Sequence, residues 1–166
     1  MNPYVTLPLL TVAALLQTTV LSRIDVLGAQ PNLVLLVVVL WSLVRGVDEG
    51  LMWAFVGGLI VDILSGGPLA GTAIALLAAA YLAGQSLGLQ VGSQVVRAMF
   101  LTALGTAGFH LALLLVLDWT GHAVDWAFSL TRVTGPSVVL NTLLAPLVLQ
   151  PLNWLDRVTR QEGLAL

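Results

Sequence analysis

Charged positions divide this chain into long apolar blocks, and these blocks predict its elements. An apolar stretch of about 17–25 residues can cross a bilayer as a helix. Charged clusters and Gly-Pro pairs mark the turns between blocks. The pattern predicts six helices, at about residues 4–22, 31–46, 49–64, 68–88, 95–117 and 133–155.

The second and third predicted helices are short for a membrane span. A helix of about 16 residues is roughly 24 Å long, against a hydrocarbon core of about 30 Å. These two helices could cross a locally thinned bilayer. Alternatively, they could form a re-entrant hairpin that leaves four full spans. We favour six spans.

Composition indicates that the bilayer is the solvent of the chain. Of its 166 residues, 58% are hydrophobic and 8% are charged, with a mean hydropathy of +1.01. Soluble domains carry about 25% charged residues. We therefore expect a single all-α transmembrane domain over residues 1–166. The first block has no basic residues before it, so we interpret it as a retained span rather than a signal peptide.

Arginine placement predicts the orientation. Six spans put both termini on one side of the membrane, together with Arg45, Arg97, Arg157 and Arg160. The other side receives Arg23 and Arg132. Because cytoplasmic loops carry the excess of basic residues, both termini are expected in the cytoplasm. The net charge of −2 gives no reason to expect nucleic acid as a partner.

Residues 118–131 form the longest predicted loop, on the side opposite the termini. Aromatic residues alternate there with polar ones: Trp119, Trp126 and Phe128 lie among Asp118, His122 and Asp125. Indole rings favour the headgroup level of a bilayer. We expect an interfacial outer loop.

Small residues recur at helical spacing on three predicted helices. Such faces let helix backbones approach closely in lipid. Two interpretations stay open: packing within the bundle, or docking of a partner's membrane helix. The candidate residues are Ala54, Gly57, Gly58, Ala80, Gly84, Gly105 and Gly108.

Asp62 is the one carboxylate inside an apolar block, and an ionised side chain there costs at least roughly 2.5–3.5 kcal/mol. It could accept hydrogen bonds from the turn that follows or cap the next helix. It could also contact a partner or ligand, or relay protons. The break after it predicts a structural turn made of Ser65, Gly66, Gly67, Pro68 and Gly71.

Other polar residues in apolar blocks are expected to fix helix faces inside the bundle. Gln17 lies in the first helix and Asn141 in the last, where Pro146 and Pro151 should cause kinks. His110 is expected to be a neutral packing residue rather than a metal ligand, because no second ligand lies three or four residues away.

No motif for chemistry is recognisable. The chain has no Cys, no Gly-rich phosphate loop, no HExxH and no carboxylate pair at catalytic spacing. We predict no catalytic residue, metal site or cofactor.

Several motifs resemble the bacterial rod shape-determining protein MreD family. They follow one another along nearly the whole chain: Gln17-Thr18-Thr19, Gln30-Pro31-Asn32-Leu33, Arg45-Gly46, the run Phe55 to Asp62, the break Ser65 to Gly71, Asn141 and Ala145-Pro146. The segment Gly-Leu-x-x-Asp-x-x-Ser-Gly-Gly-Pro-x-x-Gly is the most specific of them.

The resemblance implies a non-enzymatic scaffold in the bacterial inner membrane. Its expected partner is MreC, through MreC's single membrane helix, and indirectly RodA, a class B penicillin-binding transpeptidase and MreB. It also implies a helix layout similar to the substrate-binding components of energy-coupling-factor vitamin transporters. Such a vitamin-binding component is the alternative function, and an ion translocator is a weaker one. The sequence leaves a homodimer open.

Overall fold

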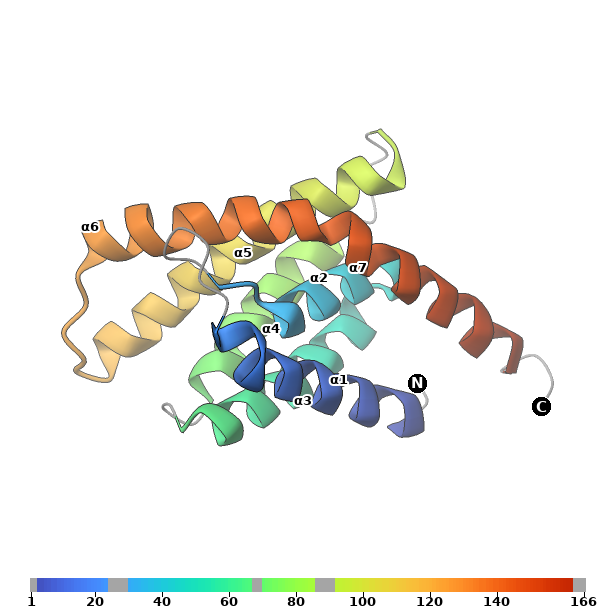
Figure 1. The fold of residues 1–166 in the computed structure, drawn as a ribbon, viewed down its shortest axis with the longest axis horizontal. Helices are drawn as coiled ribbons and strands as arrows, with labels where there is room; N and C mark the ends of the chain where they lie inside the picture. The colour runs from blue at the N-terminus through green and yellow to red at the C-terminus, as the bar shows by residue number, and fades with distance from the viewer. Residues whose placement is uncertain (1–2, 24–29, 67–69, 86–91, 163–166) are drawn as a thin grey trace.

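The computed structural model describes residues 3–23, 30–66, 70–85 and 92–162, and all of the regular secondary structure in this part of the chain is helical (Figure 1). It contains six helices of 13 residues or more. They are α1 (Pro3–Thr19), α2 (Leu33–Arg45), α3 (Val47–Ser65), α4 (Gly71–Gly84), α5 (Gln94–Trp119) and α7 (Gly135–Glu162). A 3-10 turn, Leu21–Arg23, follows α1.

The short helix α2 lies at the centre of the bundle and packs against all five other long helices. Ten consecutive residues, Val34 to Leu43, are buried. A helix that is hydrophobic on every side is buried rather than lipid-facing. The other helices shield α2 from the bilayer, so its length of roughly 20 Å need not match the hydrocarbon thickness.

The predicted outer loop 118–131 is mostly helical, which corrects the expectation. The helix α5 runs to Trp119, and Gly121, with φ +82°, makes the turn that follows. The Asp125 carboxylate then accepts from the Phe128 N–H at 3.0 Å and starts α6 (Trp126–Phe128). A π-helical segment, Ser129–Thr134, joins α6 to α7. The capping Asp125 therefore limits the loop to residues 120–125.

The last helix, α7, begins within two residues of its predicted start, extends about seven residues beyond its predicted end, and contains Pro146 and Pro151 without a break. Proline removes one helical hydrogen bond and favours a kink. Figure 1 shows that α7 changes direction along its length. The other predicted bounds hold within about three residues, except that both predicted ends of the fourth helix, 68 and 88, lie outside the described residues.

Two helical stretches, Gln94–Trp119 and Trp126–Thr159, are long and apolar enough to cross a membrane. Three apolar stretches are shorter: Thr6–Thr19, Leu33–Arg45 and Gly71–Gly84. With the composition, these helices indicate a membrane protein, and the number of spans stays a prediction. The start of α1 and the end of α7 lie on the same side of the bundle (Figure 1).

Candidate functional site

Polar side chains from three segments meet the backbone at the start of α2. The Gln17 carbonyl oxygen accepts from the Val34 N–H at 2.9 Å, and the Asn32 side chain accepts from the Leu35 N–H at 2.9 Å. The Asn141 carbonyl oxygen accepts from the Asn32 N–H at 3.1 Å. The first N–H groups of a helix have no intrahelical partner, and a bilayer core supplies no water for them. These three side chains therefore supply the hydrogen-bond acceptors that the backbone N–H groups at the start of α2 would otherwise lack.

Asn141 also connects α7 to α5. It is fully buried, and its amide donates to the Thr106 hydroxyl at 3.4 Å. One turn along α5, the His110 Nδ1 lies 2.9 Å from the Thr106 carbonyl oxygen, and the ring meets Phe109 edge-on. Asn141, Thr106 and His110 thus make their polar contacts within the helix bundle.

Asp62 caps α4, which is one of the structural arrangements that the sequence leaves open. Its side chain is 2% exposed. One carboxylate oxygen accepts from the Thr72 N–H at 3.0 Å and the other from the Ala73 N–H at 3.3 Å. A negative charge at a helix N-terminus is also favoured by the helix dipole.

The break between α3 and α4 is only partly within the described residues. Ser65 ends α3 and is exposed, and Gly66 follows it in the left-handed region at φ +66°. Gly71 begins α4 and is buried. The predicted turn residues Gly67 and Pro68 lie outside the described residues.

The small residues that were candidates for partner contact are covered by the chain's own helices. A Cβ on Gly58 would lie 2.3 Å from the Ala73 Cα, so α3 and α4 touch backbone to backbone there. Ala54 and Ala80 are fully buried. Nearest to a Cβ added at the remaining glycines are Val34 for Gly57, Val47 for Gly84, Val39 for Gly105 and Leu82 for Gly108. These contacts are those expected for packing within the bundle, and docking of a partner's membrane helix at the candidate residues stays a prediction.

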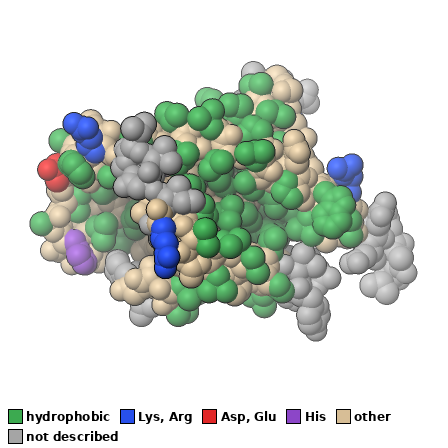
Figure 2. All heavy atoms as spheres, in the orientation of Figure 1, with side chains coloured by type: hydrophobic (Ala, Val, Ile, Leu, Met, Phe, Trp, Pro, Cys, Tyr) green, Lys and Arg blue, Asp and Glu red, His purple; other side chains and the backbone are tan. Residues whose placement is uncertain are grey.

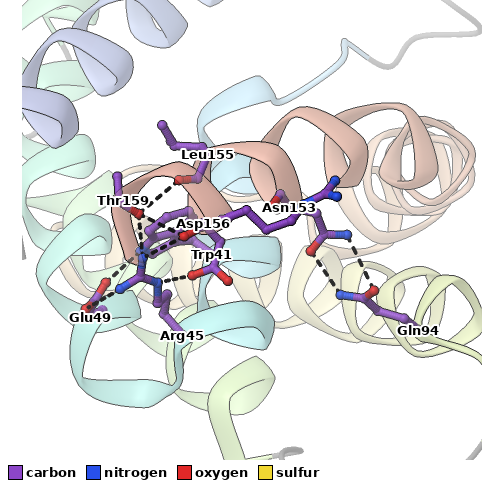
Figure 3. A network of polar contacts seen from close by, with 9 residues as sticks. Trp41, Arg45, Glu49, Gln94, Asn153, Leu155, Asp156 and Thr159 are labelled. Carbon is purple, nitrogen blue, oxygen red and sulfur yellow. Dashed lines mark hydrogen bonds and ion pairs between the residues drawn. The ribbon is translucent and has the colours of Figure 1, made fainter. Parts of the chain in front are cut away.

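An ionic cluster at the opposite end of α2 was missed by sequence reasoning (Figure 3). The Arg45 guanidinium pairs with the Asp156 carboxylate and lies 3.6 Å from a Glu49 carboxylate oxygen. It also donates to the Thr159 hydroxyl. Only the four-residue spacing of Arg45 and Glu49 was visible in the sequence, whereas Asp156 lies on a distant helix.

Aromatic rings support this ionic cluster. The Trp41 indole N–H donates to Glu49 at 3.1 Å, and the Arg45 guanidinium lies 5.3 Å from a Trp41 ring centroid. Trp41 stacks on Trp53, with ring centroids 4.3 Å apart. Nearby, the Gln94 and Asn153 side-chain amides exchange two hydrogen bonds between α5 and α7 (Figure 3). Contacts among α2, α3, α5 and α7 thus gather at one end of the bundle.

A groove opens between α1 and α7, with α2 as its floor. It consists of two adjoining hollows of about 310 and 380 Å³ that share Leu16, Leu33 and Val148. Apolar side chains line it, among them Leu9, Val20, Leu144, Pro151, Trp154 and Leu155. Figure 2 shows this face, where apolar side chains gather and few charged ones are visible.

The alternative of a vitamin-binding component would need a polar outward cavity near Trp119, Trp126 and Asp62. None of these residues lines the groove. The Asp62 carboxylate instead accepts a hydrogen bond from the Thr72 N–H at the start of α4. Among the described residues, no group of three His, Cys, Asp or Glu is placed to hold a metal ion.

These features define an all-helical membrane bundle in which Gln17, Asp62 and Asn141 accept hydrogen bonds from its own backbone. The chain belongs to the MreD family: the family model for the rod shape-determining protein MreD matches residues 1–155. Membership indicates a role in rod shape determination, in a family of shape-determining proteins rather than of known enzymes. Searches of curated proteins and of solved structures found no match. The similarity in layout to vitamin-transporter components therefore stays a prediction.

Proposed function

We propose that this protein is a non-enzymatic scaffold that binds MreC and controls lateral peptidoglycan synthesis in the bacterial inner membrane. The family match over residues 1–155 carries the proposal. RodA, a class B penicillin-binding transpeptidase and MreB are the further partners, reached through MreC. The proposed orientation places both termini in the cytoplasm, with six spans.

The buried polar groups support a scaffold rather than a catalyst. Gln17, Asp62 and Asn141 each accept hydrogen bonds from backbone N–H groups. Arg45 and Asp156 neutralise one another at the end of α2. Side chains used in this way hold helices in place, and their hydrogen-bonding capacity is not directed at a substrate.

The covered small-residue faces limit where MreC can bind. Because Ala54, Gly58 and Ala80 are buried within the bundle, the MreC helix must pack on side chains that face the lipid. In lipid, helices associate through van der Waals packing and hydrogen bonds rather than through the hydrophobic effect. We propose an interface on one exposed face of the bundle.

Co-expression with tagged MreC from the same genome tests the proposal. We expect the two proteins to co-purify in mild detergent in equal amounts, as a one-to-one or two-to-two complex. A tagged single-span protein with an unrelated helix is the matched control. Absence of association with MreC, or equal association with the control, would contradict the scaffold function.

A further inference from the structure

An exposed side-chain amide lies within the apolar part of α7. Gln150 is exposed, and among the described residues its side chain makes no hydrogen bond. The first charged residue beyond it on α7 is Asp156, which is about 9 Å further along the helix at 1.5 Å per residue. Helical side chains tilt toward the N-terminus of their helix, and on α7 this direction leads away from Asp156. In a membrane-spanning α7, the Gln150 amide therefore faces hydrocarbon.

Four other amide side chains in these helices have protein partners. Gln17 and Asn141 accept from backbone N–H groups, and Gln94 and Asn153 exchange hydrogen bonds with one another. A bilayer core holds no water to replace such partners. A glutamine side chain that faces lipid instead forms hydrogen bonds to a polar group on a neighbouring helix. The position of Gln150 therefore indicates a helix packed against the outer side of α7.

Gln150 belongs to a continuous exposed stripe on α7. Buried residues such as Ala145 and Leu149 face the opposite way, where α7 packs on α5 and α2. The stripe has the alternating four- and three-residue spacing of a coiled-coil seam and consists of Leu143, Leu147, Gln150 and Trp154. A single polar residue in such a seam fixes the register of the paired helices.

A second copy of the chain supplies a matching amide at the same depth. Copies of a membrane protein share one orientation, so the two-fold axis of a dimer runs along the membrane normal and a residue near the axis meets its own equivalent. An amide is both a donor and an acceptor, so two Gln150 side chains can exchange two hydrogen bonds. Gln94 and Asn153 make this kind of pair within one chain.

We propose that α7 pairs with α7 of a second copy through this stripe, with the two Gln150 side chains hydrogen-bonded to one another. The apolar residues of the stripe pack around the amide pair and exclude lipid from it. The pairing does not rest on the binding of MreC. It leaves exposed residues of α3 and α4, such as Phe55 and Ile74, accessible to another partner.

Disulfide crosslinking in membranes tests the pairing, with the chain expressed alone and oxidised there. Because the chain has no Cys, Leu143→Cys and Leu147→Cys should each give covalent dimers without background. Phe100→Cys and Leu104→Cys are the matched controls, because both residues are exposed on α5. They lie as far along α5 from the amide pair that links it to α7 as Leu147 and Leu143 lie along α7. Dimers that form equally at the α5 positions, or at none of the four, would overturn the proposal. Replacement of the α7 dimers by crosslinks to MreC on co-expression would also overturn it.

The role of the amide is tested by Gln150→Leu, which retains the size of the side chain and removes its hydrogen bonds. We expect the dimer dissociation constant in detergent, measured by energy transfer between labelled copies, to rise roughly eightfold, from about threefold for each of two interhelical hydrogen bonds. Gln85→Leu, at an exposed amide next to the end of α4, is the control and should leave the constant unchanged. An unchanged constant in Gln150→Leu, or an equal rise in both variants, would refute the amide pair.

Discussion

Single polar residues inside the helix bundle of this protein accept hydrogen bonds from backbone groups that lipid cannot hydrate. Gln17, Asp62 and Asn141 were recognisable in the sequence as polar residues within apolar blocks. Their hydrogen-bond partners were not, because these lie 17, 10 and 109 positions away along the chain. Sequence spacing predicts contacts within one helix, whereas these contacts depend on how helices pack.

Asp62→Ala should destabilise the bundle. The change leaves the Thr72 and Ala73 N–H groups without their acceptor, which costs about 1–3 kcal/mol for a buried donor. Asp62→Asn retains one carbonyl oxygen and should lose less. Thermal unfolding in detergent measures both. Equal losses, or no loss in Asp62→Ala, would show that the cap is unimportant.

Gly58→Ala should be more harmful than Gly57→Ala on the same helix. A Cβ at Gly58 meets the Ala73 Cα at 2.3 Å, whereas one at Gly57 meets the Val34 Cγ1 at 3.1 Å. Backbone cannot move aside as a side chain can, so we expect Gly58→Ala to cost about 1–3 kcal/mol. The two midpoints of unfolding provide the comparison, and a reversed order would refute the close α3–α4 contact.

At the scale of elements, the helices were predictable and their ends were less so. Apolar blocks between charges gave the number of long helices. The loop 118–131 was misjudged because its polar residues indicate turns, whereas Asp125 caps a helix that continues into α7. The pairing of α2 with α7 through Arg45 and Asp156 had no local signal.

Asp156→Asn should loosen the end of α7 from α2. The Arg45 guanidinium would lose its carboxylate on α7 and keep Glu49 and the Thr159 hydroxyl. A charge-assisted hydrogen bond contributes about 1.5–3 kcal/mol, so amide exchange over residues 152–162 should accelerate at least about tenfold. Asp118→Asn, at an exposed residue, is the control. Unchanged exchange in Asp156→Asn would show that the cluster does not hold α7.

At the scale of the molecule, the central position of α2 explains how a membrane bundle can contain a helix that is shorter than the hydrocarbon core is thick. Sequence reasoning treated its length as evidence about the bilayer. The structure shows instead that Val34 to Leu43 are buried among the other helices. Ala54, Gly58 and Ala80 are buried in the same way, so the proposed contact with MreC is expected on the outer surface of the bundle.

The most direct test of this account is disulfide crosslinking between the chain and the MreC membrane helix. The chain has no Cys, so single cysteines report without background. We would place them at the exposed Phe55, Ile74 and Leu143, and at the buried Ala54 and Ala80. With cysteines along the MreC helix, we predict crosslinks at exposed positions of one face and none at Ala54 or Ala80. Crosslinks at Ala54 or Ala80, or none at any position, would contradict a scaffold that binds MreC through its outer surface.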